Sequence, residues 1–149
     1  MLKGKMALAY AAGIIDGEGC IYIEHAWSKK RRYRYPFLNV SVRNTNEWIC
    51  QWFKIQFGGV VYPFTPRNPK WKVTWHWALS GHKAQEFLKL LLPYLQMKRP
   101  QAELAIQFSI RPIGSNIAYT DEEIALREAQ RILMGTYNQR GRKYEEKVR

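Results

Sequence analysis

The stretch that decides the fold is Leu8-Ala-Tyr-Ala-Ala-Gly-Ile-Ile-Asp-Gly-Glu-Gly19. Its small and apolar residues predict a helix over residues 6–15, followed by two carboxylates, Asp16 and Glu18, with one glycine between them. Acidic groups at a helix C-terminus oppose the helix dipole, so a positive charge such as a bound cation should offset them. The tetrapeptide alone also fits a plain Asp-Gly turn.

The same helix has an unusually smooth surface. Ala9, Ala12 and Gly13 lie about one helical turn apart and present little side-chain bulk, so a second backbone can approach closely. Together with the carboxylates at its tip, this face predicts a metal site at a junction between two subunits.

Two strands are expected after the motif, because polar and apolar residues alternate over residues 20–27 and 37–43. The basic run over residues 28–36 connects them as a hairpin. The inward faces should carry Ile21, Ile23, His25, Leu38, Val40 and Val42, and the outward faces Tyr22, Glu24, Ala26, Phe37, Asn39, Ser41 and Arg43.

The rest of the chain continues the pattern of strands and helices. A helix capped by Asn44 or Thr45 should run to Phe57, where Gly58-Gly59 ends it, with Trp48, Trp52 and Ile55 on its core face. Strands are predicted at 60–64 and 70–79, and helices at 82–92, 99–110 and 121–138, the last opened by the capping box Thr120-x-x-Glu123. The second of these strands alternates strictly, which predicts a core face of Trp71, Val73, Trp75, Trp77 and Leu79.

This order, αββαββα with extra C-terminal helices, predicts an α+β fold. It consists of one four-stranded antiparallel sheet with helices on one face and an open, basic face. We expect a single domain over residues 1–149, with a core at about 6–110, a helical extension at 111–140 and a charged tail at 141–149.

The charge balance narrows the class of partner. The chain has 24 Lys and Arg against 12 Asp and Glu, a net charge of +12, so a polyanion such as nucleic acid is the leading partner. An anionic membrane surface is the competing partner, but the sequence has neither a basic amphipathic helix nor an apolar run of roughly twenty residues. No membrane association is therefore expected.

Cysteine and histidine usage argues against zinc sites and disulfides. Cys20 and Cys50 are far apart, and His25, His76 and His82 lack metal-ligand spacing, so no zinc site is expected and both thiols should be reduced.

The N-terminal segment resembles a secretion signal, because Lys3 and Lys5 precede an apolar stretch, but this stretch runs directly into Asp-Gly-Glu-Gly. We expect a location in a prokaryotic cytoplasm or an organellar matrix, without secretion.

The segment Ala11-Ala-Gly-Ile-Ile-Asp-Gly-Glu-Gly19 resembles the LAGLIDADG signature of homing endonucleases and their intron-maturase relatives. The resemblance extends through Arg43-Asn-Thr-Asn-Glu-Trp, the Phe57-Gly-Gly turn and Pro93-Tyr-Leu-Gln-Met-Lys-Arg-Pro-Gln101, so that it covers roughly residues 6–110. Many members of that family carry two copies of the motif. This chain has one, which implies a homodimer about a twofold axis, with Ala9, Ala12, Gly13 and Asp16 at the interface.

The resemblance also implies roles for individual residues. The essential acid of the family falls on Glu18, where most members have Asp, and the Gly17 carbonyl is the implied second ligand of Mg²⁺. Lys98 falls where the family places a basic residue near the scissile phosphate, although it also fits a solvated lysine between helices. Asn44 falls where the family places a polar residue that positions water, and a helix cap is equally compatible.

The outward sheet face is expected to bind double-stranded DNA, because an antiparallel ribbon fits the major groove. The basic run should mostly hold phosphates, unless it is only a solvated loop or a localisation signal. Whether Arg127, Arg131 and the tail contact DNA is left open by the sequence. The predicted DNA-binding residues are Tyr22, Glu24, Lys29, Lys30, Arg31, Arg32, Arg34, Asn39, Ser41, Arg43, Lys70, Lys72, Thr74 and His76.

The resemblance thus implies a Mg²⁺-dependent, site-specific homing endonuclease, intron- or intein-encoded, that cuts both strands of a long pseudo-palindromic DNA site. Apart from the divalent cation, no small-molecule cofactor is expected. The alternatives are a maturase-type, RNA-binding splicing cofactor, or a DNA-binding protein that has lost its catalytic activity.

Overall fold

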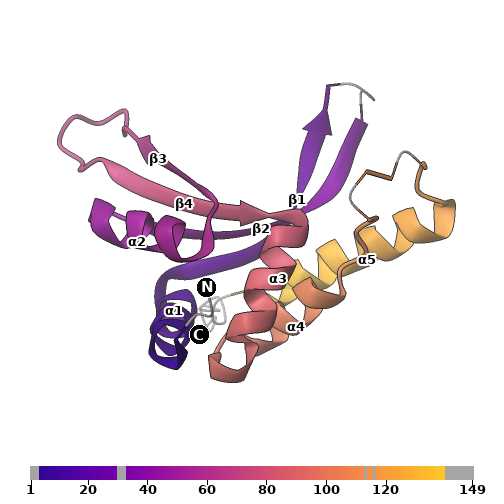
Figure 1. The fold of residues 1–149 in the computed structure, drawn as a ribbon. Helices are drawn as coiled ribbons and strands as arrows, with labels where there is room; N and C mark the ends of the chain where they lie inside the picture. The colour runs from indigo at the N-terminus through magenta and orange to yellow at the C-terminus, as the bar shows by residue number, and fades with distance from the viewer. Residues whose placement is uncertain (1–3, 30–32, 113, 116, 140–149) are drawn as a thin grey trace, which may run out of the picture.

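The computed structural model describes residues 4–29, 33–112, 114–115 and 117–139. The chain begins with the predicted order of elements, a helix, a β-hairpin and a second helix (Figure 1). A second hairpin and three further helices follow. The bounds are α1 Lys5–Glu18, β1 Gly19–Ser28, β2 Tyr33–Asn44, α2 Glu47–Phe57, β3 Val60–Phe64, β4 Thr74–Ser80, α3 Gly81–Leu91, the short 3₁₀ helix η1 Leu92–Tyr94, α4 Arg99–Gln107 and α5 Asp121–Tyr137.

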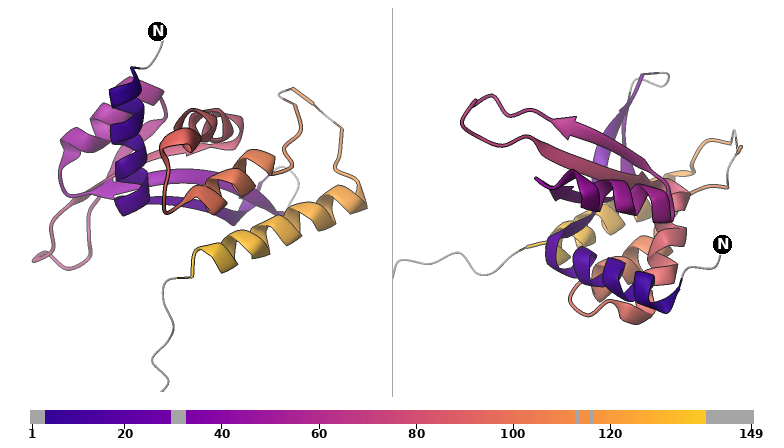
Figure 2. Two further views of the ribbon diagram at one scale, coloured as in Figure 1. Left: turned by 90° about the horizontal axis from the view of Figure 1, so that it is seen from below. Right: turned by 60° about the vertical axis from the view of Figure 1, so that its left-hand side comes forward.

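The four strands form one antiparallel sheet in the order β1-β2-β4-β3, which confirms the predicted α+β fold. The helices lie on one face of this sheet, and the two hairpins rise at opposite ends, so that the helix-free face is concave (Figure 1). Seen from the helical side, α1 and α4 lie across the strands, and α5 flanks the edge strand β1 (Figure 2). The fold therefore leaves one broad sheet surface uncovered.

The hydrophobic core lies between the sheet and the helices. Of the predicted inward residues of β1 and β2, the apolar ones are buried, because an alternating strand with one covered face presents every second side chain to the helices. The exception is His25, which is exposed and pairs with Glu128 of α5. Trp77 is fully buried between Phe53 and Phe87, with ring centroids at 4.6 and 5.3 Å, and its indole N–H donates to the Gly58 carbonyl at 2.8 Å. This cluster joins β4 to α2 and α3.

The fourth strand is shorter than predicted. It begins at Thr74, and the preceding residues form part of the connection from β3. Trp71 and Val73, which alternation placed in the core, are 68% and 40% exposed. The reason is that β3 ends at Phe64, opposite Thr74, and Pro66 and Pro69 keep the following residues from extending the ladder.

The β1–β2 hairpin is correspondingly longer than predicted, with β2 beginning at Tyr33 rather than Phe37. Pro36 is accommodated opposite His25 because this part of β2 pairs only with β1, while β4 pairs with β2 from Asn39 onward.

The first turn of α2 also differs from prediction. Its N-cap is Asn46, whose side chain accepts from the Trp48 N–H at 3.0 Å. The helix buries Ile49, Cys50 and Phe53, whereas Trp48 and Ile55 are 60% and 78% exposed. The prediction was wrong because it placed Trp48 on the core face. Each residue turns the helix by about 100°, so when Ile49 and Phe53 face the sheet, Trp48 faces solvent.

The C-terminal helix α5 has a capped first turn and an ion pair with β1 of the first hairpin. Its predicted capping box is present, with both Thr120–Glu123 hydrogen bonds at 3.2 Å. Along its length, the Glu128 carboxylate pairs with Arg131 and with His25 of β1. The Arg131 guanidinium is the main cause that lowers the pKa of Glu128 to about 2.

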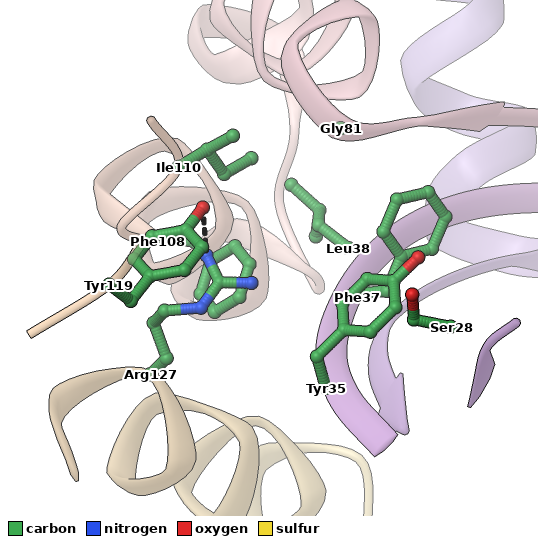
Figure 3. Close-up of a pocket in the computed structure, with 9 residues that line it drawn as sticks. All are labelled: Ser28, Tyr35, Phe37, Leu38, Gly81, Phe108, Ile110, Tyr119 and Arg127. Carbon is green, nitrogen blue, oxygen red and sulfur yellow. Dashed lines mark hydrogen bonds between the residues drawn. The ribbon is translucent and has the colours of Figure 1, made fainter. Parts of the chain in front are cut away.

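Whether Arg127 contacts DNA was left open by the sequence. In the structure its side chain joins α5 to β2 and to Ser109, two residues after the end of α4. Its side chain reaches into a cavity of about 300 Å³, where its guanidinium lies over the rings of Phe108 and Tyr119 (Figure 3). It donates to the carbonyls of Ser109 and Pro36. Since Arg127 is only 5% exposed and lies on the helical side of the sheet, it does not belong to the uncovered surface.

Candidate functional site

The helix of the sequence motif continues further than predicted and carries Glu18 as its last residue. The backbone N–H of Gly19 closes the helix by donating to the carbonyls of Ile14 and Ile15. A side chain at Gly19 would place its Cβ 2.7 Å from the Ile15 Cα, so the exit from α1 into β1 requires glycine. The Asp-Gly-Glu segment is therefore a helix end and not a turn between strands.

This helix end is held by the segment between η1 and α4. The Asp16 carboxylate accepts from the backbone N–H groups of Gln96 and Lys98, at 2.8 and 2.9 Å. In the other direction, the Lys98 ammonium donates to the carbonyls of Ile15 and Asp16, at 2.9 and 2.8 Å. We refer to these four hydrogen bonds, which join Ile15 and Asp16 to Gln96 and Lys98, as the helix latch.

The helix latch concerns two of the expectations from the sequence. Part of the positive charge that offsets the acidic helix end is the Lys98 ammonium, placed on the last carbonyls of α1, where a cation stabilises the helix dipole. The Asp16 carboxylate, predicted at the subunit interface, binds two backbone N–H groups of its own chain. Both side chains thereby fix the position of the residues that follow, Gly17 and Glu18.

Replacing Lys98 by methionine should destabilise the folded chain by about 2 kcal/mol, because two charge-assisted hydrogen bonds are lost and the Ile15 and Asp16 carbonyls lose their donor. Urea denaturation followed by circular dichroism measures the change. Lys83→Met, at an exposed position on α3, is the matched control and should stay within about 0.5 kcal/mol of the parent. Equal stability of Lys98→Met and the control would contradict the latch.

Glu18 is exposed at the tip of α1, and Asn44 holds it from the end of β2. The Asn44 side-chain amide donates to Glu18 Oε2 at 2.8 Å. The orientation of the amide is set on its other side, because Asn44 Oδ1 accepts from the Asn46 N–H at 2.8 Å. Asn44 therefore joins the Glu18 carboxylate to the turn before α2, while the N-cap of α2, which the sequence placed at Asn44 or Thr45, is Asn46.

The donors around Glu18 suit a hard divalent cation. Its second carboxylate oxygen, Oε1, has no hydrogen bond among the described residues. The Gly17 carbonyl comes directly after the two carbonyls that the Lys98 ammonium binds and accepts no hydrogen bond from a described residue outside α1. Within the described ranges, no group of three or more histidine, cysteine or acidic side chains gathers in one place. One chain thus has two exposed oxygen atoms here that a cation could use as ligands.

The concave sheet face begins at Glu18. A shallow pocket of about 340 Å³ on this face brings together five of the predicted residues from α1, β1 and β2. The sixth, Cys20, is exposed and was not predicted, although it continues the outward alternation of Tyr22 and Glu24. The lining residues are Glu18, Cys20, Tyr22, Glu24, Ser41 and Arg43.

Polar side chains on this face are linked across the strands. The Asn39 amide donates to Glu24 at 3.0 Å, and the Tyr22 and Ser41 hydroxyls hydrogen-bond. Burial, followed by the nearby Glu24 charge, raises the pKa of Tyr22, so its hydroxyl keeps its proton at neutral pH. Asn39 and Ser41 are each only 8% exposed, which leaves them chiefly to orient the more exposed Glu24 and Tyr22.

The other predicted DNA-binding residues are spread around this pocket. His76 lies on the same face but is 6% exposed, with Thr74 as its hydrogen-bond partner at 3.3 Å. Lys29 and Arg34 are exposed near the tip of the first hairpin, while Lys30, Arg31 and Arg32 fall outside the described residues. Lys70 and Lys72 are exposed in the β3–β4 connection and not within a strand.

The exposed face of α1 differs by one residue from the predicted interface. Ala12 is fully buried in the core of its own chain with Ala11 and Ile15, because these positions face the sheet. Ala9 and Gly13 are exposed, and Gly17 continues the same side of the helix. A Cβ placed on Gly13 or Gly17 would meet no atom within 4 Å.

Neither of the two cysteines forms a disulfide. Cys50 is buried, and its thiol faces the carbonyls of Val42 and Trp75, at 3.7 and 3.5 Å. Among the described helices, none combines the length and the apolar character needed to span a bilayer.

Comparison with solved structures identifies the fold. The homing endonuclease I-CvuI, solved with the I-CreI target DNA and Mg, aligns with a TM-score of 0.70 and 24% identity over 93% of this chain and 87% of that chain. The archaeal intron-encoded homing endonuclease I-Vdi141I, solved with DNA, aligns at 0.67 with 12% identity over 97% and 91%. The LAGLIDADG homing endonuclease I-SmaMI, bound to cleaved DNA, aligns at 0.64 with 13% identity over 93% and 48%.

No family model and no curated protein matches the sequence. The structural alignments nevertheless cover more than nine-tenths of the chain in all three cases. The chain therefore has the fold of the LAGLIDADG homing endonucleases.

Proposed function

We propose that this protein is a LAGLIDADG homing endonuclease, a site-specific endodeoxyribonuclease encoded within an intron or intein. The observation that carries the proposal is the placement of Glu18: an exposed acid at the motif helix tip, oriented by Asn44 and opening onto a concave sheet face. The sequence motif and the fold of three DNA-bound homing endonucleases support the same function.

The active form we propose is a homodimer. One chain offers a single motif with two oxygen ligands and one sheet, which is one active site. Cleaving both strands of a DNA duplex requires two active sites, which two copies of the chain would provide. The exposed side of α1, with Ala9, Gly13 and Gly17, permits a close twofold contact that would bring both Glu18 side chains together. The chain also spans about half the length of I-SmaMI, so two copies would match that protein in size.

The chemistry of the site follows from its donors. Glu18 and the Gly17 carbonyl would hold the divalent cation, which when bound polarises the phosphate and activates water for hydrolysis. Asn44 keeps the Glu18 carboxylate in one orientation. Lys98 holds the end of α1 in place and adds positive charge beneath it, where negative charge develops during phosphodiester cleavage.

The DNA would lie along the concave face. Tyr22, Glu24 and Arg43 reach outward from the first hairpin and can contact base edges in the major groove. Exposed lysines and arginines at both hairpin tips can hold phosphates and set the register without reading sequence.

A competition gel-shift experiment separates a DNA endonuclease from an RNA-binding maturase-type protein. The full chain is incubated with a labelled random DNA duplex in the presence of Mg²⁺, and unlabelled duplex or structured RNA is titrated in. We expect duplex DNA to compete at a lower concentration than RNA of equal length and to be cleaved at selected sequences. Stronger competition by RNA, with no cleavage of any duplex, would favour the maturase-type function.

A further inference from the structure

The second hairpin presents an apolar surface on the side of the sheet where polar residues were expected. Val60, Tyr62 and Phe64 alternate along β3 and are 58%, 47% and 55% exposed. Val61, between them, packs against the core, so the three exposed side chains share the outward face. None of them was assigned a function from the sequence. We refer to Val60, Tyr62 and Phe64 as the β3 apolar strip.

The β3 apolar strip is continuous with the ring of His76 on β4. The centroid of the His76 ring lies 5.2 Å from that of Tyr62 and 5.7 Å from that of Phe64, and both pairs are tilted. Burial, followed by the Arg43 charge, lowers the pKa of His76, so the imidazole is neutral at physiological pH. The outward surface of β3 and β4 is therefore uncharged and largely aromatic.

Positive charge surrounds this apolar surface. Arg43 lies opposite His76 on β2, and Arg67, Lys70 and Lys72 are exposed in the connection that follows the strip. A partner that satisfies both features needs anionic groups at its border and apolar groups at its centre. The major groove of DNA has both where it contains thymine, because the thymine C5-methyl group is an apolar group on the groove floor between two phosphate backbones.

We propose that the β3 apolar strip recognises thymine C5-methyl groups in the DNA target, so that the site contains A·T pairs wherever the strip contacts it. The inference rests on the proposed function and adds a specificity determinant to it. The polar first hairpin, with Tyr22, Glu24 and Arg43, reads hydrogen-bonding groups, whereas the second hairpin reads methyl groups by apolar contact.

The strand register predicts that these A·T base pairs lie near the phosphodiester bonds that are cleaved. Phe64 lies opposite Thr74, and the next residue of β4, Trp75, lies opposite Asn44, which holds Glu18. The Phe64 end of the strip is therefore close to the catalytic end of β2, while the tip of the first hairpin points to the opposite end of the sheet (Figure 1). Thymines should appear in the inner part of each half-site rather than at its outer end.

The experiment compares thymine with deoxyuridine, which lacks only the C5-methyl group. Preferred duplexes are first selected from a random library with the full-length protein, and thymines of the inner positions are then replaced one at a time by deoxyuridine. Because burying one methyl group is equivalent to about a fourfold change in affinity, each contacted thymine should lose about fourfold in binding on replacement. Phe64→Ala should bind both duplexes with equal affinity at the position that Phe64 contacts.

The matched control is Ile132→Ala, which removes a side chain of similar exposure from α5, outside the sheet. It should retain the fourfold difference between thymine and deoxyuridine. Circular dichroism of Phe64→Ala checks that the variant is folded, and Tyr62→Ala provides a second test at the neighbouring position.

The possible outcomes separate this inference from the proposed function. Selected sites that are bound and cut, but that show no inner thymines or no effect of deoxyuridine, would overturn the inference and leave the endonuclease intact. The inference is also wrong if Phe64→Ala keeps the thymine preference but alters self-association of the free protein, which would make the strip a protein interface. Failure to select any duplex would instead count against the proposed function.

Discussion

Glu18→Gln is expected to lower the rate of DNA cleavage by on the order of a thousandfold or more while DNA binding persists. The substitution keeps the size of the side chain and its contact with Asn44, but removes the negative charge that would hold a divalent cation. Binding should be retained or become tighter, because one carboxylate less faces the DNA phosphates. Cleavage of a selected duplex and its gel shift, measured on the same preparation, give both quantities.

The matched control for this prediction is Glu103→Gln, the same change at an exposed helical position on α4 that is remote from α1 in the sequence. It should cleave at the parent rate, since Glu103 pairs only with Arg99 among the described residues, at 3.5 Å. Cleavage by Glu18→Gln at the same rate as this control would remove Glu18 from the active site.

Gly13→Leu is expected to prevent dimerisation and to abolish double-strand cleavage while making the monomer slightly more stable. Inside the chain a Cβ at Gly13 meets nothing within 4 Å, and leucine favours a helix over glycine by up to about 1 kcal/mol. In a twofold contact between two α1 helices each substitution occurs twice, so two leucines would separate the backbones. Thermal denaturation, analytical ultracentrifugation and cleavage assays measure the three effects.

Gly135→Leu is the control for this variant, because Gly135 is also an exposed helical glycine, on α5, with an equally open Cβ position. It should gain a similar stability and keep both the dimer and the cleavage activity. If Gly13→Leu remained a dimer that cuts both strands, the two copies would not meet along α1.

The sequence predicted the sheet and its two faces well where alternation was strict and one face was covered. In β1 and β2 a shift by one residue would have moved every apolar side chain into solvent, so the pattern of Ile21, Leu38 and Val40 determined the register. The same rule failed for Trp71 in the β3–β4 connection, because alternation reports which side a residue would face and not whether a partner strand exists beside it.

The site was predicted in its parts and not in its connections. The motif indicated Glu18, and the resemblance indicated Asn44 and Lys98, but the helix latch joins Lys98 to Ile15 and Asp16 across separations of 83 and 82 residues. Contacts of this kind leave no local signal, which is why the sequence did not indicate that Lys98 offsets the charge at the end of α1 or that Asp16 binds the backbone of Gln96 and Lys98. Cys20 and the β3 apolar strip, by contrast, follow from alternation and could have been found.

The most direct test of a symmetric, Glu18-dependent nuclease is the sequence of duplexes that the purified full-length protein cleaves in a randomised library with Mg²⁺. We predict a consensus of two inverted half-sites, cut on both strands near the centre, which is absent when Glu18→Gln is used. An asymmetric consensus, a single-strand cut or an identical set of cleaved duplexes from Glu18→Gln would contradict it.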